Sequence, residues 1–437
     1  MKRATCLALL LVMAAAPGSA AQRELLGNGL TVLVQANAAS DVVTARLITR
    51  VSVLDEPDEG AGVRYLTQQL LLRGSAGLDG TQVAGLVDNL GATLEVGVET
   101  ELVYTEINAP SDCAAQALAL LAQVVERPAL APEELELARQ QALLQLQLAA
   151  GDPGQRAQQL FLAGLYGGHP YGRSLVGTAE GLAACSRERV AQFHRAHYLP
   201  NRSILVICGR VAAERAYELA AWCFGAWAPG MPPSAPARPV PALAGSRMKV
   251  EERPVLGCYL MLGFRAPGVT SPDYPALLVL DSLLGKGMGS RLYLSVRDRA
   301  AIAYRAQSVC GELARQNYYA LLVVTGPGSL QAAKDMIVRE VGLLQEQPIA
   351  EVQMQRARRF AIGTYLLEHQ RNRDVARYLG WYEALGLGSG FDQQVPALVE
   401  RVTAEDVARV ARTHFGHYFV SVLVPRAMPQ KDELAVE

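Results

Sequence analysis

The sequence has almost no net charge. Its 41 lysine and arginine residues nearly match its 42 aspartate and glutamate residues, which leaves a formal charge of −1. Proteins that bind nucleic acid through its phosphates need a basic excess or a basic stripe. The near balance therefore predicts that nucleic acid is not a partner of this protein.

Cysteine and histidine are few and scattered. The chain has seven cysteines, and no two of them have the spacing of a zinc site or of a C-x-x-C redox pair. Sequence alone does not pair them into disulfides. The six histidines include two H-x-x-H pairs, His194 with His197 and His414 with His417. Neither pair has a carboxylate at ligand spacing, so capping or partial burial explains them better than metal binding.

Long apolar runs are also missing after the first twenty residues, so no membrane span is predicted. The chain opens with Met1, Lys2 and Arg3, continues with an apolar run over residues 4–16, and then has small residues up to Ala20. This order predicts a signal peptide over residues 1–20. A membrane anchor is the alternative, but the run is far shorter than the ~20 residues that cross a bilayer. We therefore expect a periplasmic or secreted protein.

What is present is enough apolar sequence for more than one core. The chain has 437 residues, of which 50% are hydrophobic and 19% charged, and a chain of this size usually forms two or more domains. Residues 228–246 are rich in proline and read as a linker. The predicted domains are therefore residues 21–227 and 247–428, with a short tail over 429–437.

The two predicted domains show the same order of elements, which indicates an internal duplication. Each opens with strand patterns and a helix, and each closes with a helix that runs into a strand. Ser186 and Thr403 are the predicted N-caps of these closing helices, because acidic residues follow them in the first turn. Strands and long helices alternate irregularly in both halves, which favours an α+β fold.

One predicted helix, within residues 62–75, has a polar face that carries Tyr65, Gln68 and Gln69. A zinc protease helix would carry the H-x-x-E-H motif at this spacing, with two zinc ligands and a general base on one face. A second predicted helix, over residues 132–150, starts well with Pro132 at its first turn. Far downstream, Arg297 and Tyr304 lie seven residues apart after a glycine-bearing segment.

Several segments, each weak alone, occur in a specific order. They are residues 62–75, 168–172, 177–178, 198–201 and 287–293, followed by Arg297 and Tyr304. In this order the chain resembles the pitrilysin or insulinase (M16) family of zinc metallopeptidases, especially bacterial members similar to subunits of the mitochondrial processing peptidase. The resemblance implies two homologous domains, each a mainly antiparallel sheet covered by helices, which form half of a clam-shaped chamber.

The resemblance also implies that the metal site is lost. It places Tyr65 and Gln69 at the two histidine positions, Gln68 at the catalytic glutamate and Gln145 at or near the third ligand, while Ala138 replaces an accessory glutamate. A neutral amide is a poor zinc ligand and has no useful basicity. No zinc or other cofactor is therefore expected in this chain.

Arg297 and Tyr304 keep the family pattern. In the family this pair donates hydrogen bonds to the substrate backbone near the scissile carbonyl, where negative charge develops. The alternative is an exposed helical arginine and a tyrosine packed in a sheet. Ala301, between them, stands where the family usually has glycine.

Together these features predict a non-catalytic subunit of a heterodimeric metallopeptidase, inactive alone. The expected partners are a homologous subunit that carries zinc, and peptide substrates. The alternative is a scaffold or binding protein that keeps the peptidase fold without a role in proteolysis.

Overall fold

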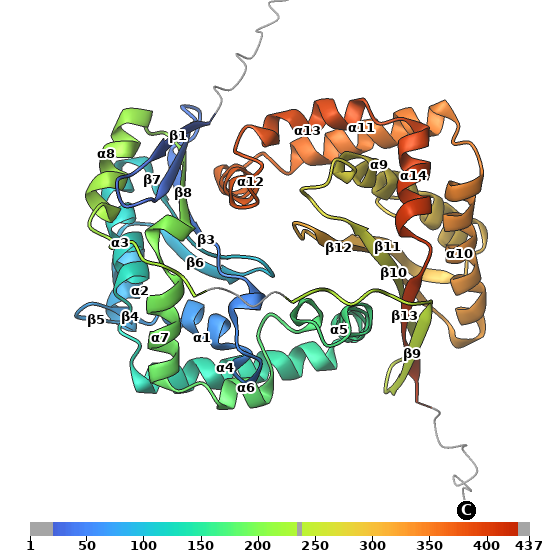
Figure 1. Cartoon of the computed structure of the whole chain (residues 1–437), viewed down its shortest axis with the longest axis horizontal. Coiled ribbons are helices and arrows are strands. Elements are labelled where there is room, and N and C mark those ends of the chain that lie inside the picture. Colours follow the sequence, from blue (N-terminus) through green and yellow to red (C-terminus); the bar gives the residue numbers. More distant parts are fainter. Residues whose placement is uncertain (1–20, 234–237, 427–437) are drawn as a thin grey trace, which may run out of the picture.

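The structure is a computed structural model, and it describes residues 21–233 and 238–426. The predicted signal peptide and the tail over 429–437 lie outside the described residues, as do four residues of the predicted linker. The domain boundaries stay a prediction, but each half of the chain builds one main β-sheet (Figure 1).

The first sheet has six strands in the order β1-β2-β8-β3-β7-β6. Its neighbours pair antiparallel, except for the parallel pair β2 and β8. The strands are β1 (Gln22–Leu25), β2 (Thr31–Ala36), β3 (Val42–Thr49), β6 (Thr93–Val98), β7 (Val103–Pro110) and β8 (Ser203–Gly209). Between β3 and β6 in the sequence, β4 (Gly74–Ser75) and β5 (Leu78–Asp79) form a separate two-stranded sheet.

The second sheet has the strand order β11-β12-β10-β13-β9. Here too a single parallel pair, β13 with β9, interrupts antiparallel pairing. The strands are β9 (Arg247–Arg253), β10 (Cys258–Pro267), β11 (Ala303–Cys310), β12 (Gln316–Thr325) and β13 (Tyr418–Pro425). Read from β9, this order matches the first sheet read from β2, so the predicted α+β fold of two related halves is confirmed.

Helices cover both sheets (Figure 1). Those of the first half are α1 (Val63–Leu70), α2 (Gly80–Asn89), α3 (Ala114–Glu126), α4 (Pro132–Gly151), α5 (Pro153–Tyr166), α6 (Ala179–Ala183), α7 (Arg187–His197) and α8 (Ala213–Phe224). Those of the second half are α9 (Tyr274–Leu284), α10 (Leu330–Glu346), α11 (Glu351–Leu367), α12 (Asn372–Ala384), α13 (Phe391–Glu400) and α14 (Ala404–His414). Among the described residues no helix has the length and apolar content needed to cross a membrane.

Both predicted N-caps are found. The Ser186 side chain accepts a hydrogen bond from the Arg189 backbone N–H at the start of α7. Thr403 forms a capping box with Asp406 at the start of α14. Each cap satisfies a backbone donor that the helix itself leaves free, which is why these two starts are readable from sequence.

One helix from each half of the chain packs on the sheet of the other half. Helix α5 packs on β10 and β13 of the second sheet, where the Phe161 and Phe419 rings meet edge to face at 6.5 Å. Helix α12 packs on β3 and β8 of the first sheet, where Gly380 lies against Ile48 and Val206. Figure 1 shows α12 between the two halves. The halves are therefore joined by shared cores and not only by the linker.

Candidate functional site

The short helix α1 is fixed by buried charge at its start. The Glu56 carboxylate accepts hydrogen bonds from the backbone N–H groups of Gly62 and Arg64, at 3.1 and 3.0 Å. The buried Arg64 guanidinium donates to backbone carbonyls of the segments beside it, those of Val51, Glu99 and Leu102. Gly62 has φ +113°, a left-handed conformation that favours glycine. This frame sets the direction in which the α1 side chains point.

Gln68, at the predicted position of the catalytic glutamate, is fully buried and fully engaged. Its amide nitrogen donates to the Tyr104 carbonyl and the Thr105 hydroxyl, at 2.5 and 3.1 Å. Its amide oxygen accepts from the Tyr198 hydroxyl at 2.7 Å. Burial raises the pKa of Tyr198, although the Arg64 cation opposes the shift. Gln68 therefore joins α1 to β7 and to the end of α7, and it offers nothing to a ligand.

Tyr65 and Gln145 lie far apart in sequence, and the structure brings them together. The Tyr65 hydroxyl on α1 donates to the Gln145 side-chain oxygen on α4 at 2.5 Å. Burial raises the pKa of Tyr65, while Arg73 opposes it. Arg73 adds two further links from the end of α1 to α4, to Glu134 at 2.8 Å and to Gln141 at 2.6 Å. Gln69 is partly exposed and makes no side-chain hydrogen bond to another described residue.

These side chains do not fit zinc. The Tyr65 hydroxyl donates to an amide oxygen, and the Gln68 amide already uses both its nitrogen and its oxygen in hydrogen bonds. Neither residue provides the imidazole, thiolate or carboxylate that zinc prefers. Ala138, at the accessory position, is buried in the core. Across residues 21–233 and 238–426, no group of three or more His, Cys, Asp or Glu side chains could hold a metal ion.

The first histidine pair, His194 and His197, makes structural contacts. His194 is buried against the Val125 carbonyl oxygen, 2.8 Å from its Nε2, and burial lowers its pKa to about 4. His197 lies instead beside Arg202, with 3.0 Å between its Nδ1 and the guanidinium. The two rings therefore have separate partners. The six cysteines in the described part of the chain are free thiols.

Arg297 and Tyr304 both lie on the surface. Arg297 belongs to a short π-helix over Tyr293–Arg299 that runs into β11, and its guanidinium lies 5.0 Å from the centre of the Tyr293 ring. Tyr304 is 75% exposed, so it does not pack in the sheet. It sits at an irregularity where the pairing of β11 with β12 skips from Ala303 to Arg305. Such bulges redirect a side chain away from the regular sheet.

The turn between Arg297 and Tyr304 has a backbone conformation that favours glycine, although the residue there is alanine. Ala301 has φ +52°, in the left-handed region that costs an ordinary residue roughly 1 kcal/mol. Neither Arg297 nor Tyr304 has a side-chain hydrogen bond to another described residue. Both side chains are therefore free to donate to a bound molecule.

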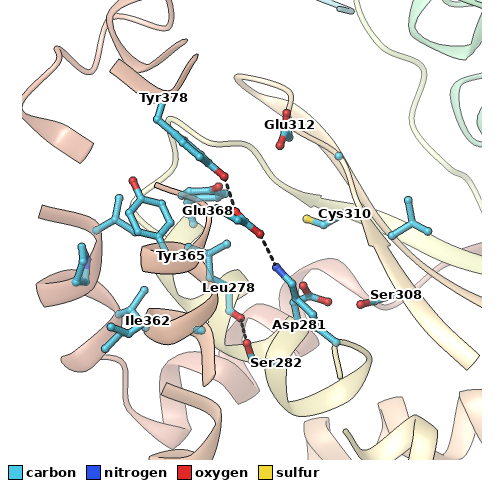
Figure 2. Close-up of a pocket in the computed structure, with 18 of the residues that line it drawn as sticks. Leu278, Asp281, Ser282, Ser308, Cys310, Glu312, Ile362, Tyr365, Glu368 and Tyr378 are labelled. Carbon is cyan, nitrogen blue, oxygen red and sulfur yellow. Dashed lines mark hydrogen bonds and ion pairs between the residues drawn. The ribbon is translucent and has the colours of Figure 1, made fainter. Parts of the chain in front are cut away.

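Sequence reasoning missed one further site, a cavity beside α9 (Figure 2). It is lined by Asp281, which lies inside the apolar run of α9 between Leu280 and Ser282. A charged residue on the buried face of a helix is a readable signal, because such residues are rarely buried without a partner.

Two family models match the chain. The model described as insulinase (peptidase family M16) matches residues 31–179, and the model described as peptidase M16 inactive domain matches residues 184–360. Among curated proteins, the chain is 25% identical to an uncharacterized zinc protease of Mycobacterium leprae, over 93% of this chain and 92% of that protein. It is 21% identical to one of Bacillus subtilis, over 91% and 96%.

Solved structures show the same fold. A protease from Helicobacter pylori superposes with a TM-score of 0.87 at 19% identity, covering 93% of this chain and 99% of that one. A structure from Pseudomonas fluorescens, described as a peptidase M16 inactive domain, superposes with a TM-score of 0.86 at 21% identity, covering 94% of this chain and 99% of that one. The two family models, matched in order along most of the chain, agree with this architecture, and the chain belongs to peptidase family M16.

Proposed function

We propose that this chain is the non-catalytic subunit of a two-chain zinc metallopeptidase. A homologous partner with an intact H-x-x-E-H helix would supply the metal and its chemistry. This chain would supply substrate contacts from Arg297 and Tyr304. The segment over residues 1–20 supports export to the periplasm or beyond.

One contrast carries the proposal. Tyr65, Gln68, Gln69 and Gln145 occupy the helix positions where the family has its metal ligands and base. Tyr65 bonds to Gln145, Gln68 bonds to β7, and Gln69 offers only a neutral amide. Arg297 and Tyr304, by comparison, are exposed and have donors to spare. A guanidinium and a phenol can donate to a peptide carbonyl oxygen and stabilise the negative charge that develops on it. The chain thus offers substrate binding without the means to hydrolyse.

The test is to purify this chain alone and with a co-expressed M16 protein that carries H-x-x-E-H, and to measure zinc content and cleavage of an unstructured peptide. We expect zinc and cleavage only in a stable mixed complex. Zinc binding and cleavage by the lone chain would overturn the proposal. If no mixed complex forms with any such relative, the scaffold alternative is favoured instead.

In that complex, Arg297→Ala should lower turnover by about 10²-fold, the usual cost of removing one donor to a developing oxyanion. Assembly should be unchanged, because Arg297 is exposed and bonds no described neighbour. Arg299→Ala is the matched control, since Arg299 is an exposed arginine on the same short helix. Equal turnover of the two variants would argue against a role for Arg297.

A further inference from the structure

The second half contains a cavity of about 370 Å³ between α9, β11 and the helices α11, α12 and α13. Figure 2 shows Asp281, Ser308, Cys310 and Glu368 around it. Its walls are otherwise mainly apolar or aromatic, with Leu278, Val309, Ala361, Ile362, Val395, Pro396, Val399, Tyr274, Tyr365, Tyr378 and Trp381 among the lining residues.

By topology, this cavity occupies the place that the degenerate metal site has in the first half. Helix α9 follows strand β10 as α1 follows β3, and α11 follows α10 as α4 follows α3. Strands β11 and β12 hold the positions of β6 and β7 in their sheet. The duplication therefore made two equivalent sites, of which the first is closed by hydrogen bonds and the second remains hollow.

Among the charged side chains that line the cavity, Asp281 is the one without a salt bridge to a described residue. The residue is 8% exposed, and its Oδ1 has no hydrogen-bond partner among the described residues. The buried Tyr319 hydroxyl also has no hydrogen-bond partner among the described residues. Burial raises the pKa of Asp281, although Ser308, Lys286 and Tyr319 partly favour its charged form. A buried carboxylate with one unbonded oxygen and no salt bridge is compensated only in part for its desolvation.

The other charged side chains of the cavity are paired. Glu368 lies 3.5 Å from the Lys286 ammonium and accepts a hydrogen bond from the Tyr378 hydroxyl at 2.5 Å. Glu312 bonds to the Arg377 guanidinium. The Tyr365 hydroxyl donates to Asp392 on the far side. Asp281 therefore has no salt-bridge partner among the described residues, and its ionised form gives the cavity one negative charge that no salt bridge compensates.

We propose that this cavity binds a small organic cation, an ammonium or guanidinium group on an apolar stem, with Asp281 as its counter-ion. The charge on the ligand matches the unpaired carboxylate, and the aromatic rings suit a cation as well as an apolar stem. The volume suits a single side chain or a small amine. This binding does not depend on the proposed proteolytic role.

The same cation can be a free amine or the side chain of a basic residue in a peptide, and calorimetric titration of the full chain distinguishes the two. The probes are n-pentylammonium, the peptide acetyl-Gly-Lys-Gly-amide, and 1-pentanol as the neutral analogue. We expect saturable binding of at least one cation and much weaker binding of the alcohol. Tighter binding of the amine than of the peptide indicates a free amine as the natural ligand, and the reverse order indicates a basic side chain.

Asp281→Asn should weaken cation binding by about ten-fold or more, because it removes the counter-ion and keeps the shape. Glu346→Gln is the matched control, since it removes one carboxylate at the exposed end of α10, outside the cavity, and should leave binding unchanged. Ala361→Met fills the cavity with the carboxylate in place and should also weaken binding. The proposal is overturned if neither cation binds, if 1-pentanol binds equally well, or if folded Asp281→Asn binds as the wild type does.

Discussion

The two topologically equivalent sites, one in each half of the chain, differ in whether their buried polar side chains have hydrogen-bond partners. In the first half, Gln68 uses every donor and acceptor of its amide, and Tyr65 closes on Gln145. In the second half, Asp281 remains buried with an unbonded oxygen beside an open cavity. A buried polar group without a partner costs free energy, whereas a bonded one is close to neutral. The side chains of the first site are therefore bonded to the protein itself, whereas the second site keeps a cavity and an unbonded carboxylate oxygen.

The change with the largest expected effect on stability introduces a carboxylate into the first site. Gln68→Glu places a charge against the Tyr104 carbonyl and removes both donated hydrogen bonds, so we expect a loss of about 3 kcal/mol in the free energy of unfolding at pH 7. Urea denaturation measures it.

The same variant has a predicted pH dependence. A buried glutamate has a folded pKa above its unfolded value, so the loss should shrink at low pH and grow as the pH rises through the folded pKa. Gln69→Glu is the control, because Gln69 is partly exposed and has no described hydrogen bond. A similar loss in both variants would mean that Gln68 is not the support that its contacts indicate.

Neutralising the second site should have the opposite sign. Asp281→Asn removes an uncompensated buried charge, so we expect a gain of about 1 kcal/mol at pH 7 without ligand. Burial raises the pKa of Asp281 in the folded protein. The wild type therefore loses stability as the pH rises from the unfolded pKa through the folded pKa, and the variant does not.

Denaturation curves of wild type and Asp281→Asn at pH 3 and pH 8 check this expectation. The difference between the two proteins should be largest at pH 8 and nearly absent at pH 3. A variant that is less stable than the wild type at pH 8 would show that Asp281 already has a partner, and the contrast between the two sites would fail.

The smallest effect is expected for the contact between α1 and α4. Tyr65→Phe removes one partly exposed hydrogen bond, to Gln145, and should cost about 0.5 to 1 kcal/mol. A double-mutant cycle with Gln145→Ala isolates the pair, and its coupling energy should be of similar size. Zero coupling would mean that the two helices are held by the Arg73 contacts alone.

Local patterns explain what was predictable in the fold. The N-caps at Ser186 and Thr403 depend on residues within one turn, and the strands and long helices follow from periodicity. The edge strands β1 and β9 were missed because they are largely exposed and lack an apolar face. The packing of α5 and α12 on the sheet of the opposite half was also not predicted. Nothing in the sequence around Gly164 or Gly380 indicates that an aromatic ring or a sheet lies against these glycines.

The sequence by itself determined the family pattern and predicted the loss of the metal ligands, because side-chain chemistry at fixed spacing decides whether zinc can bind. It also singled out Arg297 and Tyr304. Only the tertiary structure decided that Tyr65 meets Gln145, that Gln68 has no free donor, and that Asp281 faces a cavity. These outcomes depend on contacts between segments far apart in the chain, and periodicity and capping carry no information about such contacts.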